Sequence, residues 1–430
     1  MNRTAVALSI ASCMAMDAMA SSLEMLWERD PLWEFTQETF LPAARPLGFK
    51  WMTASCDLAR CGPREKMTVG GVPVGEAVAR FSDGRLSEIS AVLYARGDNG
   101  EITRGEFEDL IKRSVAAISG VSGVKAQMRG KDLKGAARAE GVVWQTARTQ
   151  LLLEYAISRV VTATGVNYRP EFVRLEISPL NKRQPAKELV FASKSDAKPD
   201  FRTKVKKSSG GDVWISGVPM VDQGDKSYCL VASAERVLRY YGMRVDQNEL
   251  AQLVGTDRWR GTDLKAAQEG LRQAGGRLRF KVKMEDEPDL REFEALVQDY
   301  NRRSTRFGKK LQVITPQGDV DPFQVMAEMQ LEALKETRLA QRAKMARFLR
   351  SVMSSVDAGQ PLLWGVALGV VPEAGLVQKS GGHVRLILGY NPITNEILYS
   401  DSWGAGHELK RMTASDAWII HSFSLGLTPW

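Results

Sequence analysis

Histidine is scarce in this chain of 430 residues, which contains only His383, His407 and His421. A structural zinc site takes four Cys or His ligands. Cys56 and Cys61 lie close together, but no histidine and no second cysteine pair is near them. We therefore do not expect zinc at this pair, and the sequence indicates no cofactor.

Long apolar runs are also missing. After residue 20, no stretch reaches the roughly 18 uninterrupted apolar residues that a membrane span needs. We expect no membrane span and a soluble mature protein.

The first 20 residues have the layout of a secretory signal peptide. Met1-Asn2-Arg3 precedes a mostly apolar run over 4–16, and Ala18-Met19-Ala20 offers a cleavage site before Ser21. This layout predicts a secreted or periplasmic protein. Two alternatives stay open: a lipoprotein box ending at Cys13, or simply a weakly apolar start.

Cysteine is nearly as rare as histidine, with four residues in the whole chain. Cleavage after Ala20 would remove Cys13. In an oxidising compartment Cys56 and Cys61 would form a small local disulfide, which leaves Cys229 as an unpaired thiol.

The formal net charge of +8 raises the question of a nucleic-acid partner. Residues 181–211 contain nine Lys or Arg against three Asp or Glu, so this stretch supplies +6 (9 − 3) of the excess. It lacks interleaved aromatic residues and matches no recognisable nucleic-acid-binding module. We expect a solvated basic linker over 181–211 and no nucleic-acid partner.

The composition, 44% apolar and 26% charged, is that of an ordinary globular protein of two or three domains. Residues 21–180 read as an α+β accessory domain. Asp83-Gly84 predicts a hairpin between strands at 76–81 and 86–95, and Thr103 with Glu106 predicts a capped helix. Further strands are expected around 142–155 and 171–178. The domain has no catalytic constellation, and its role as a substrate-recruiting, autoregulatory or packing module stays open.

Residues 218–242 contain the most informative pattern in the chain. Cys229 begins a helical run whose apolar face comprises Leu230, Ala234, Val237, Leu238 and Tyr241, and Gly242 ends it. A helix N-terminus favours negative charge and therefore the thiolate form of a cysteine. Gln223 stands six positions earlier (229 − 223), where its carboxamide and the backbone N–H of Cys229 could form an oxyanion hole.

The last quarter of the chain supplies partners for a thiol nucleophile. Strands are predicted at 362–371, 383–390 and 396–400, with a turn over 391–395 between the last two. His383 begins one strand and Asp401 follows the next, so an antiparallel pair would bring them side by side. His383 would be the base and Asp401 would orient it, while Gly382 allows close backbone approach beside the histidine. His407 falls in a predicted loop, and His421 has no evident partner.

These residues, in this order, resemble the papain-like cysteine peptidases, specifically the double-glycine (bacteriocin-processing) branch. The resemblance covers roughly residues 213–430 and rests on Gln223-Gly224, Cys229, His383 and Asp401-Ser402-Trp403-Gly404. It implies an α+β fold in which the nucleophile helix packs on an antiparallel sheet, and it implies that Trp403 shields the His-Asp pair. Two positions depart from papain: Leu230 replaces a Trp and Asp401 an Asn. An acid is usual in the double-glycine branch.

The resemblance places a peptidase domain at 212–430 with a helical insertion at about 285–357. A helix over 256–275, capped by Thr262 and ended by Gly275-Gly276, and a strand over 277–284 come before this insertion. Asp321-Pro322 predicts an N-cap, with helical character to about Val356. The stretch is either a surface helix with alternating charges or an insertion over the cleft.

The sequence thus predicts a secreted or periplasmic cysteine peptidase that acts on protein or peptide substrates through an acyl-enzyme intermediate. Two alternatives use the same residues. The acyl group could pass to an amine, as in transglutaminase-like or peptidoglycan-modifying enzymes, or the domain could be an inactive peptidase-like binding protein. Substrate preference and oligomeric state stay open.

Overall fold

The computed structural model shows a mixed α+β protein. It describes residues 21–26, 32–62, 66–132, 139–162, 165–180, 200–224, 226–243, 245–256, 261–286, 290–308, 321–373 and 379–430. The predicted signal peptide, with Cys13, and residues 181–199 of the predicted linker lie outside these ranges. The chain divides into two compact units: Met1–Trp51, Ser55–Lys131 and Ala139–Lys182 form the first, and Met52–Ala54, Asp132–Arg138 and Arg183–Trp430 the second.

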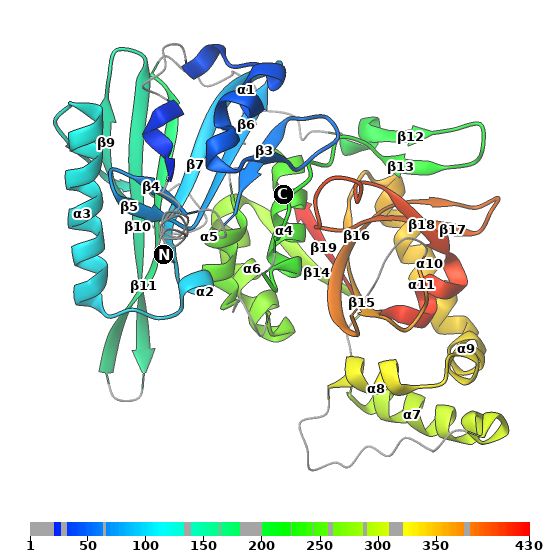
Figure 1. Ribbon diagram of the computed structural model, residues 1–430. Coiled ribbons are helices and arrows are strands. Elements are labelled where there is room, and N and C mark those ends of the chain that lie inside the picture. Colours follow the sequence, from blue (N-terminus) through cyan, green and yellow to red (C-terminus); the bar gives the residue numbers. More distant parts are fainter. Residues whose placement is uncertain are drawn as a thin grey trace, which may run out of the picture. The chain divides into compact units, whose positions relative to one another are not determined.

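The first unit contains a long sheet in the strand order β2-β3-β6-β7-β11-β10-β9-β8, antiparallel from β2 to β9 (Figure 1). Its strands are β2 (Lys50–Trp51), β3 (Leu58–Cys61), β6 (Glu76–Ser82), β7 (Arg85–Ala95), β8 (Gln127–Asp132), β9 (Ala139–Gln145), β10 (Thr149–Thr162) and β11 (Gly165–Pro179). A small sheet has the order β1 (Ser21–Ser22), β4 (Met67–Val69) and β5 (Val72–Val74). The helices are α1 (Gln37–Ala44), α2 (Arg96–Asn99) and α3 (Arg104–Ser122).

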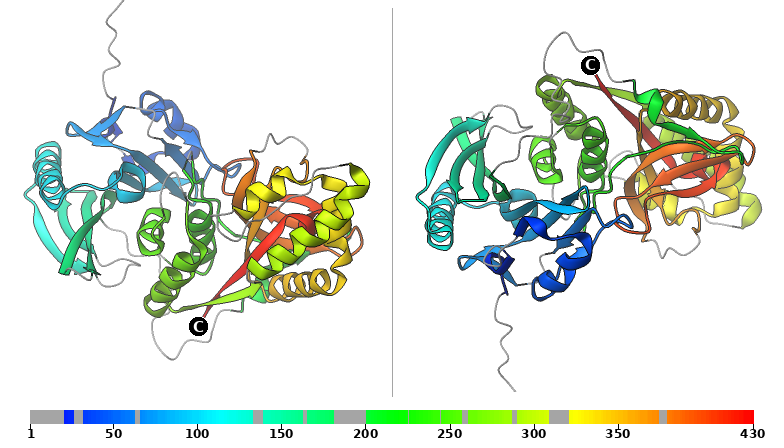
Figure 2. Two further views of the ribbon diagram at one scale, coloured as in Figure 1. Left: turned by 90° about the horizontal axis from the view of Figure 1, so that it is seen from below. Right: turned by 90° about the horizontal axis from the view of Figure 1, so that it is seen from above.

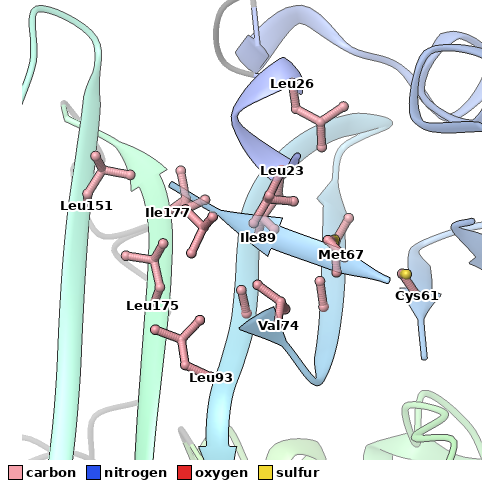
Figure 3. Close-up of a cluster of buried hydrophobic side chains, with 14 of the residues drawn as sticks. Leu23, Leu26, Cys61, Met67, Val74, Ile89, Leu93, Leu151, Leu175 and Ile177 are labelled. Carbon is pink, nitrogen blue, oxygen red and sulfur yellow. The ribbon is translucent and has the colours of Figure 1, made fainter. Parts of the chain in front are cut away.

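Apolar residues at alternate positions of the strands form the core of this unit. Val173, Leu175 and Ile177 of β11 are fully buried, and Leu175 and Ile177 join Leu151 of β10 in one apolar cluster (Figure 3). Helix α3 adds Phe107 to the same cluster.

Two local predictions for this unit are confirmed. Asp83 and Gly84 both take positive φ (52° and 76°) in the hairpin between β6 and β7, as a two-residue turn requires. Thr103 and Glu106 form a reciprocal capping box at the start of α3. The stretch 142–155 is instead two strands, β9 and β10, because Thr146 and Thr149 close a turn between them.

The predicted disulfide between Cys56 and Cys61 is not formed in the structure. Cys61 belongs to the buried core (Figure 3), where its thiol donates to the carbonyl of Leu47 at 2.7 Å. Cys56 lies in the turn before β3 with φ of 53°.

The second unit contains a sheet in the order β12-β13-β16-β15-β19-β14, with β17 paired to β16 and β18 (Figure 1). The pairs are antiparallel. The strands are β12 (Val205–Lys207), β13 (Val213–Ile215), β14 (Phe280–Asp286), β15 (Leu362–Leu368), β16 (Gly381–Asn391), β17 (Glu396–Ser400), β18 (Lys410–Thr413) and β19 (His421–Pro429). Strand β12 falls in the stretch predicted as linker, because Val205 pairs with Ile215 of β13 and is half-buried.

Helices cover both faces of this sheet. Leu363 of β15 packs in a cluster with α4 (Cys229–Tyr240), α5 (Gln247–Val254) and α6 (Leu264–Leu278). Its neighbours Leu362 and Trp364, on the opposite face, pack with α7 (Leu290–Ser304), α8 (Pro322–Glu328), α9 (Leu331–Ala340), α10 (Arg342–Asp357) and α11 (Ala414–Ile420). Figure 2 shows α4–α6 in green and α7–α10 in yellow-green to gold on the two sides of the strands.

The stretch from Asp321 to Val356 is not the single surface helix that was predicted. Asp321 caps α8 as predicted, but the segment continues as three separate helices, and α7 precedes them. Phe348, Val352 and Val356 of α10 are buried in the core. This segment is thus one of the two helical layers of the unit.

Helix α6 also differs from its prediction. Asp263 caps it in place of Thr262, and it runs through Gly275 and Gly276 to Leu278. Gly275 is required for packing, since a Cβ there would lie 2.4 Å from the carbonyl oxygen of Phe280. Strand β14 consequently begins at Phe280. Within the described residues, no helix combines the length and apolar character needed to cross a membrane.

Candidate active site

Cys229 is the first residue of α4, as predicted, and the residue is half-buried. The predicted apolar face of the helix is buried, and the helix ends before Gly242, which takes φ of 84°. Burial raises the pKa of the Cys229 thiol, but a hydrogen bond with His383 and the charge of His383 lower it by more. The thiol is therefore more acidic than an ordinary cysteine.

His383 and Asp401 lie side by side, as the antiparallel pairing of β16 and β17 predicts. The Nε2 atom of His383 donates to Oδ1 of Asp401 at 3.1 Å, and both side chains are buried. This bond leaves Nδ1 as the ring nitrogen for the hydrogen bond with Cys229. Burial lowers the pKa of His383, but its hydrogen bonds and the charges of Asp401 and Cys229 raise it by more.

Trp403 stacks on the imidazole of His383, with ring centroids 4.5 Å apart and an interplanar angle of 20°. The indole thus covers one face of the imidazole.

Asp401 receives a second strong partner that the sequence did not suggest. The Nε atom of Arg385 donates to the same Oδ1 atom at 2.8 Å. Burial raises the pKa of Asp401, but the hydrogen bond from His383 and the charge of Arg385 hold it far below its usual range. The carboxylate is therefore ionised at neutral pH.

Gln223 is anchored to the residue that follows Asp401. Its backbone N–H donates to the carbonyl of Ser402 at 2.9 Å, and the Ser402 hydroxyl donates to its Oε1 atom at 2.7 Å. Its Nε2 atom donates to the carbonyl of Lys226 at 2.7 Å. These partners fix the orientation of the carboxamide, because a flipped amide would set two acceptors against each other at Lys226. One of the two amide protons is then used at Lys226, which leaves the second for another acceptor.

Gly382 allows the close approach that was predicted, but the approaching group is a side chain. A Cβ at this position would lie 2.7 Å from the ring of Phe323 on α8. Gly382 itself is exposed, so one side of the residue before His383 is open and the other is covered by an aromatic ring.

Two buried arginines of the site, Arg236 and Arg385, were not expected from the sequence. Arg385 stands two positions after His383 on β16, which places it on the same strand face. Arg236 stands seven positions after Cys229 on α4, which is two helical turns. A charged residue inside a strand that is otherwise apolar was the available signal for Arg385. Arg236 had none, because an arginine on an amphipathic helix normally lies on the solvated face.

The other two histidines have different surroundings. His407 accepts from Lys410 Nζ through Nδ1 at 2.8 Å and lies edge-on to Trp403. His421, expected to have no partner, is buried and bonded through Nε2 to Asp286 at 2.9 Å. Its Nδ1 atom accepts from Trp364 Nε1 at 3.1 Å. The sequence did not reveal this pair because residues 286 and 421 meet only when β14 and β19 become neighbours.

In the part of the chain that the structure describes, no group of three or more His, Cys, Asp or Glu side chains is arranged to hold a metal ion. No protein-family model matches the chain, and a comparison with curated proteins finds no significant match.

Proposed function

We propose that this protein is a cysteine peptidase that hydrolyses peptide bonds with Cys229, His383 and Asp401. The observation that carries the proposal is the row of three groups in which His383 bonds to Asp401 at 3.1 Å and also interacts with the Cys229 thiol, whose pKa it lowers. Nucleophilic catalysis by a thiol needs a base within reach and a third group that orients the base, and this row supplies both. The pKa directions agree, since a lowered thiol pKa beside a raised imidazole pKa favours the thiolate–imidazolium pair.

In the proposed reaction, the Cys229 thiolate attacks the carbonyl carbon of the scissile bond. The negative charge that develops on the oxygen is stabilised by the backbone N–H of Cys229, which has no carbonyl partner within the helix, and by the second amide proton of Gln223. The C–N bond then breaks, and His383 gives its proton to the leaving amine, which leaves a thioester on Cys229. His383 next takes a proton from water, the water oxygen attacks the thioester, and the carboxylic acid leaves as the C–S bond breaks and the thiolate–imidazolium pair is restored.

The second unit has the elements that a papain-like domain would use. Helix α4 carries the nucleophile and packs on antiparallel strands β15, β16 and β19. Gln223, Cys229, His383 and Asp401 follow one another in the papain-like order. We propose this fold assignment together with the activity, and the signal-peptide layout of residues 1–20 supports action outside the cytoplasm.

Incubation of the purified chain with an unfolded test protein, followed by mass analysis of the products, tests the proposal. Hydrolysis adds one water per cleaved bond, and Cys229→Ala should abolish the new peptides. Repeating the reaction with an added primary amine separates hydrolysis from acyl transfer, because transfer would give products that carry the amine. If neither product forms, the peptidase proposal fails and the binding-protein alternative replaces it. The cleaved sequences from a complex peptide mixture would define the substrate class.

A further inference from the structure

Two side chains share one oxygen of Asp401. His383 Nε2 lies 3.1 Å from Oδ1, and Arg385 Nε lies 2.8 Å from the same atom. The side chains of Arg385 and Asp401 are fully buried. In such surroundings a charge-assisted hydrogen bond is strong and directional, so Arg385 has a decisive influence on where this carboxylate points.

Arg385 is itself held from its far side. Its Nη1 and Nη2 atoms lie 2.9 and 3.2 Å from the two carboxylate oxygens of Glu373. The Tyr399 hydroxyl donates to Glu373, and the guanidinium lies over the Tyr399 ring at 4.5 Å. The arginine is therefore a rigid bridge between two carboxylates. A lysine could not make this bridge, since it has a single ammonium in place of a planar fork.

The second oxygen of Asp401 faces a competing cation. Lys410 Nζ lies 3.7 Å from Oδ2, and His407 Nδ1 lies 4.0 Å from it, both beyond hydrogen-bonding distance. Among the described residues, this buried Oδ2 atom makes no hydrogen bond. A small rotation of the carboxylate would bring it to Lys410 and weaken its bond with His383.

We infer that Arg385 is a positioning residue of the site, which holds Oδ1 of Asp401 against His383 and prevents the carboxylate from turning to Lys410. The inference rests on the proposed function, since it concerns the orientation of the same imidazole. It assigns Arg385 no contact with substrate. The charged and titratable groups around the His383–Asp401 pair are Cys229 and Arg236 on α4, Glu373 after β15, Arg385 on β16, Tyr399 on β17, and His407 and Lys410.

The test measures the rate at which iodoacetamide alkylates Cys229 between pH 5 and 9, with the labelled residue identified by mass mapping. The alkylation rate depends on the fraction of Cys229 in the thiolate form, and its measurement does not require peptidase activity. The variants are Arg385→Met, Arg385→Lys, and each of these combined with Lys410→Met. Arg411→Met is the matched control, because Arg411 is half-exposed and pairs with Asp212 and Glu396 away from Cys229.

We expect the apparent thiol pKa to rise in the order wild type, Arg385→Lys, Arg385→Met. A rise of one unit lowers the rate about tenfold at a pH below both values. Adding Lys410→Met should restore part of the lost rate, because the competing cation is then gone. Arg411→Met should keep the wild-type profile. If Arg385→Met does not fold, Arg385→Lys and its double variant carry the same comparison.

Two results would overturn the inference alone: a wild-type profile in Arg385→Lys and Arg385→Met, or a loss that Lys410→Met does not relieve, which would make the effect a general disruption of the site. A wild-type protein whose Cys229 reacts with an ordinary thiol pKa would instead overturn the proposed function, and the inference with it.

Discussion

Arg236 Nη1 donates to the backbone carbonyl of Asp401 at 2.9 Å, so the helix that begins at Cys229 is tied directly to the acid of the site. Its Nη2 atom donates to the Ser400 hydroxyl at 2.7 Å, and its Nε atom to the carbonyl of Pro219 at 2.8 Å. Burial lowers the pKa of Arg236 to about 10, which still leaves it charged at neutral pH. One side chain thus connects α4, the end of β17 and the segment that leads to Gln223.

Arg236→Met should destabilise the second unit and impair the site together. Each buried acceptor left without a donor costs about 1–3 kcal/mol, so the loss of three donors should lower the free energy of unfolding by about 3 kcal/mol or more. Urea unfolding measures this change. Arg350→Met, at an exposed position of α10, should change it little. Equal stability of the two variants would contradict the connecting role of Arg236.

Cys229→Ala and His383→Ala should each reduce hydrolysis of an unfolded test protein to background, since nucleophile and base act as one unit. Far-UV circular dichroism should show that both variants stay folded. Cys56→Ala is the matched control, because Cys56 lies in the first unit, and it should keep wild-type activity. Wild-type turnover by either site variant would remove that residue from the mechanism.

Gln223→Ala should lower kcat by roughly 10² to 10³, the range found for the loss of an oxyanion donor, with little change in KM. Ser402→Ala should lower kcat less, because the carboxamide keeps its bond to Lys226 but loses the hydroxyl that orients it. Gln273→Ala, at an exposed position of α6, serves as the control. If kcat does not change in Gln223→Ala, the residue is not an oxyanion donor.

Asp401→Ala should be milder than Cys229→Ala and should change the pH profile. The charge of Asp401 helps to raise the pKa of His383, so its removal lets that pKa fall. The imidazolium is then lost at a lower pH, and the alkaline limb of the plot of kcat/KM against pH should move to lower pH. An alkaline limb that stays in place would show that Asp401 does not stabilise the imidazolium.

The sequence predicted the parts of the site that depend on local pattern. Strand β17 begins and ends where alternation and the turn over 391–395 placed it, and the start of α4 follows from the apolar face after Cys229. The pairing of His383 with Asp401 followed from the strands predicted at 383–390 and 396–400 alone. Their catalytic roles and the papain-like assignment stay predictions.

The parts that could not be predicted depend on contacts distant in sequence. Local rules predict a helix end at Gly275, yet this residue lies inside α6 because only a glycine fits against the carbonyl of Phe280. An arginine in a sequence is normally expected to be a solvated surface charge. Only the folded chain shows that Arg236 and Arg385 are both buried around Asp401. Likewise, the helices α7–α10 form a packed layer because of neighbours far along the chain.

His421 should make the protein less stable as pH falls below about 6.5, the pKa of an unperturbed histidine. Burial lowers the pKa of His421, and the charge of Arg338 lowers it further, against the opposing hydrogen bond with Asp286. Its Nδ1 atom accepts from Trp364, so protonation there would also break that bond. As pH falls, the unfolded chain therefore takes up the proton first, and each unit of difference between the two pKa values contributes about 1.4 kcal/mol.

His383 has the opposite effect on the pH dependence of stability, so the measurement has to separate the contributions of the two histidines. Its pKa is raised in the folded protein, so its contribution is complete below the unfolded pKa and is lost as pH rises through the folded one. Wild-type stability alone would mix the two effects. Urea midpoints at pH 7.5 and 5.5 should therefore be compared between wild type and His421→Gln. The variant should be less stable at pH 7.5 but should lose less, or gain, on acidification. An identical pH dependence in both proteins would mean that His421 does not titrate in this range.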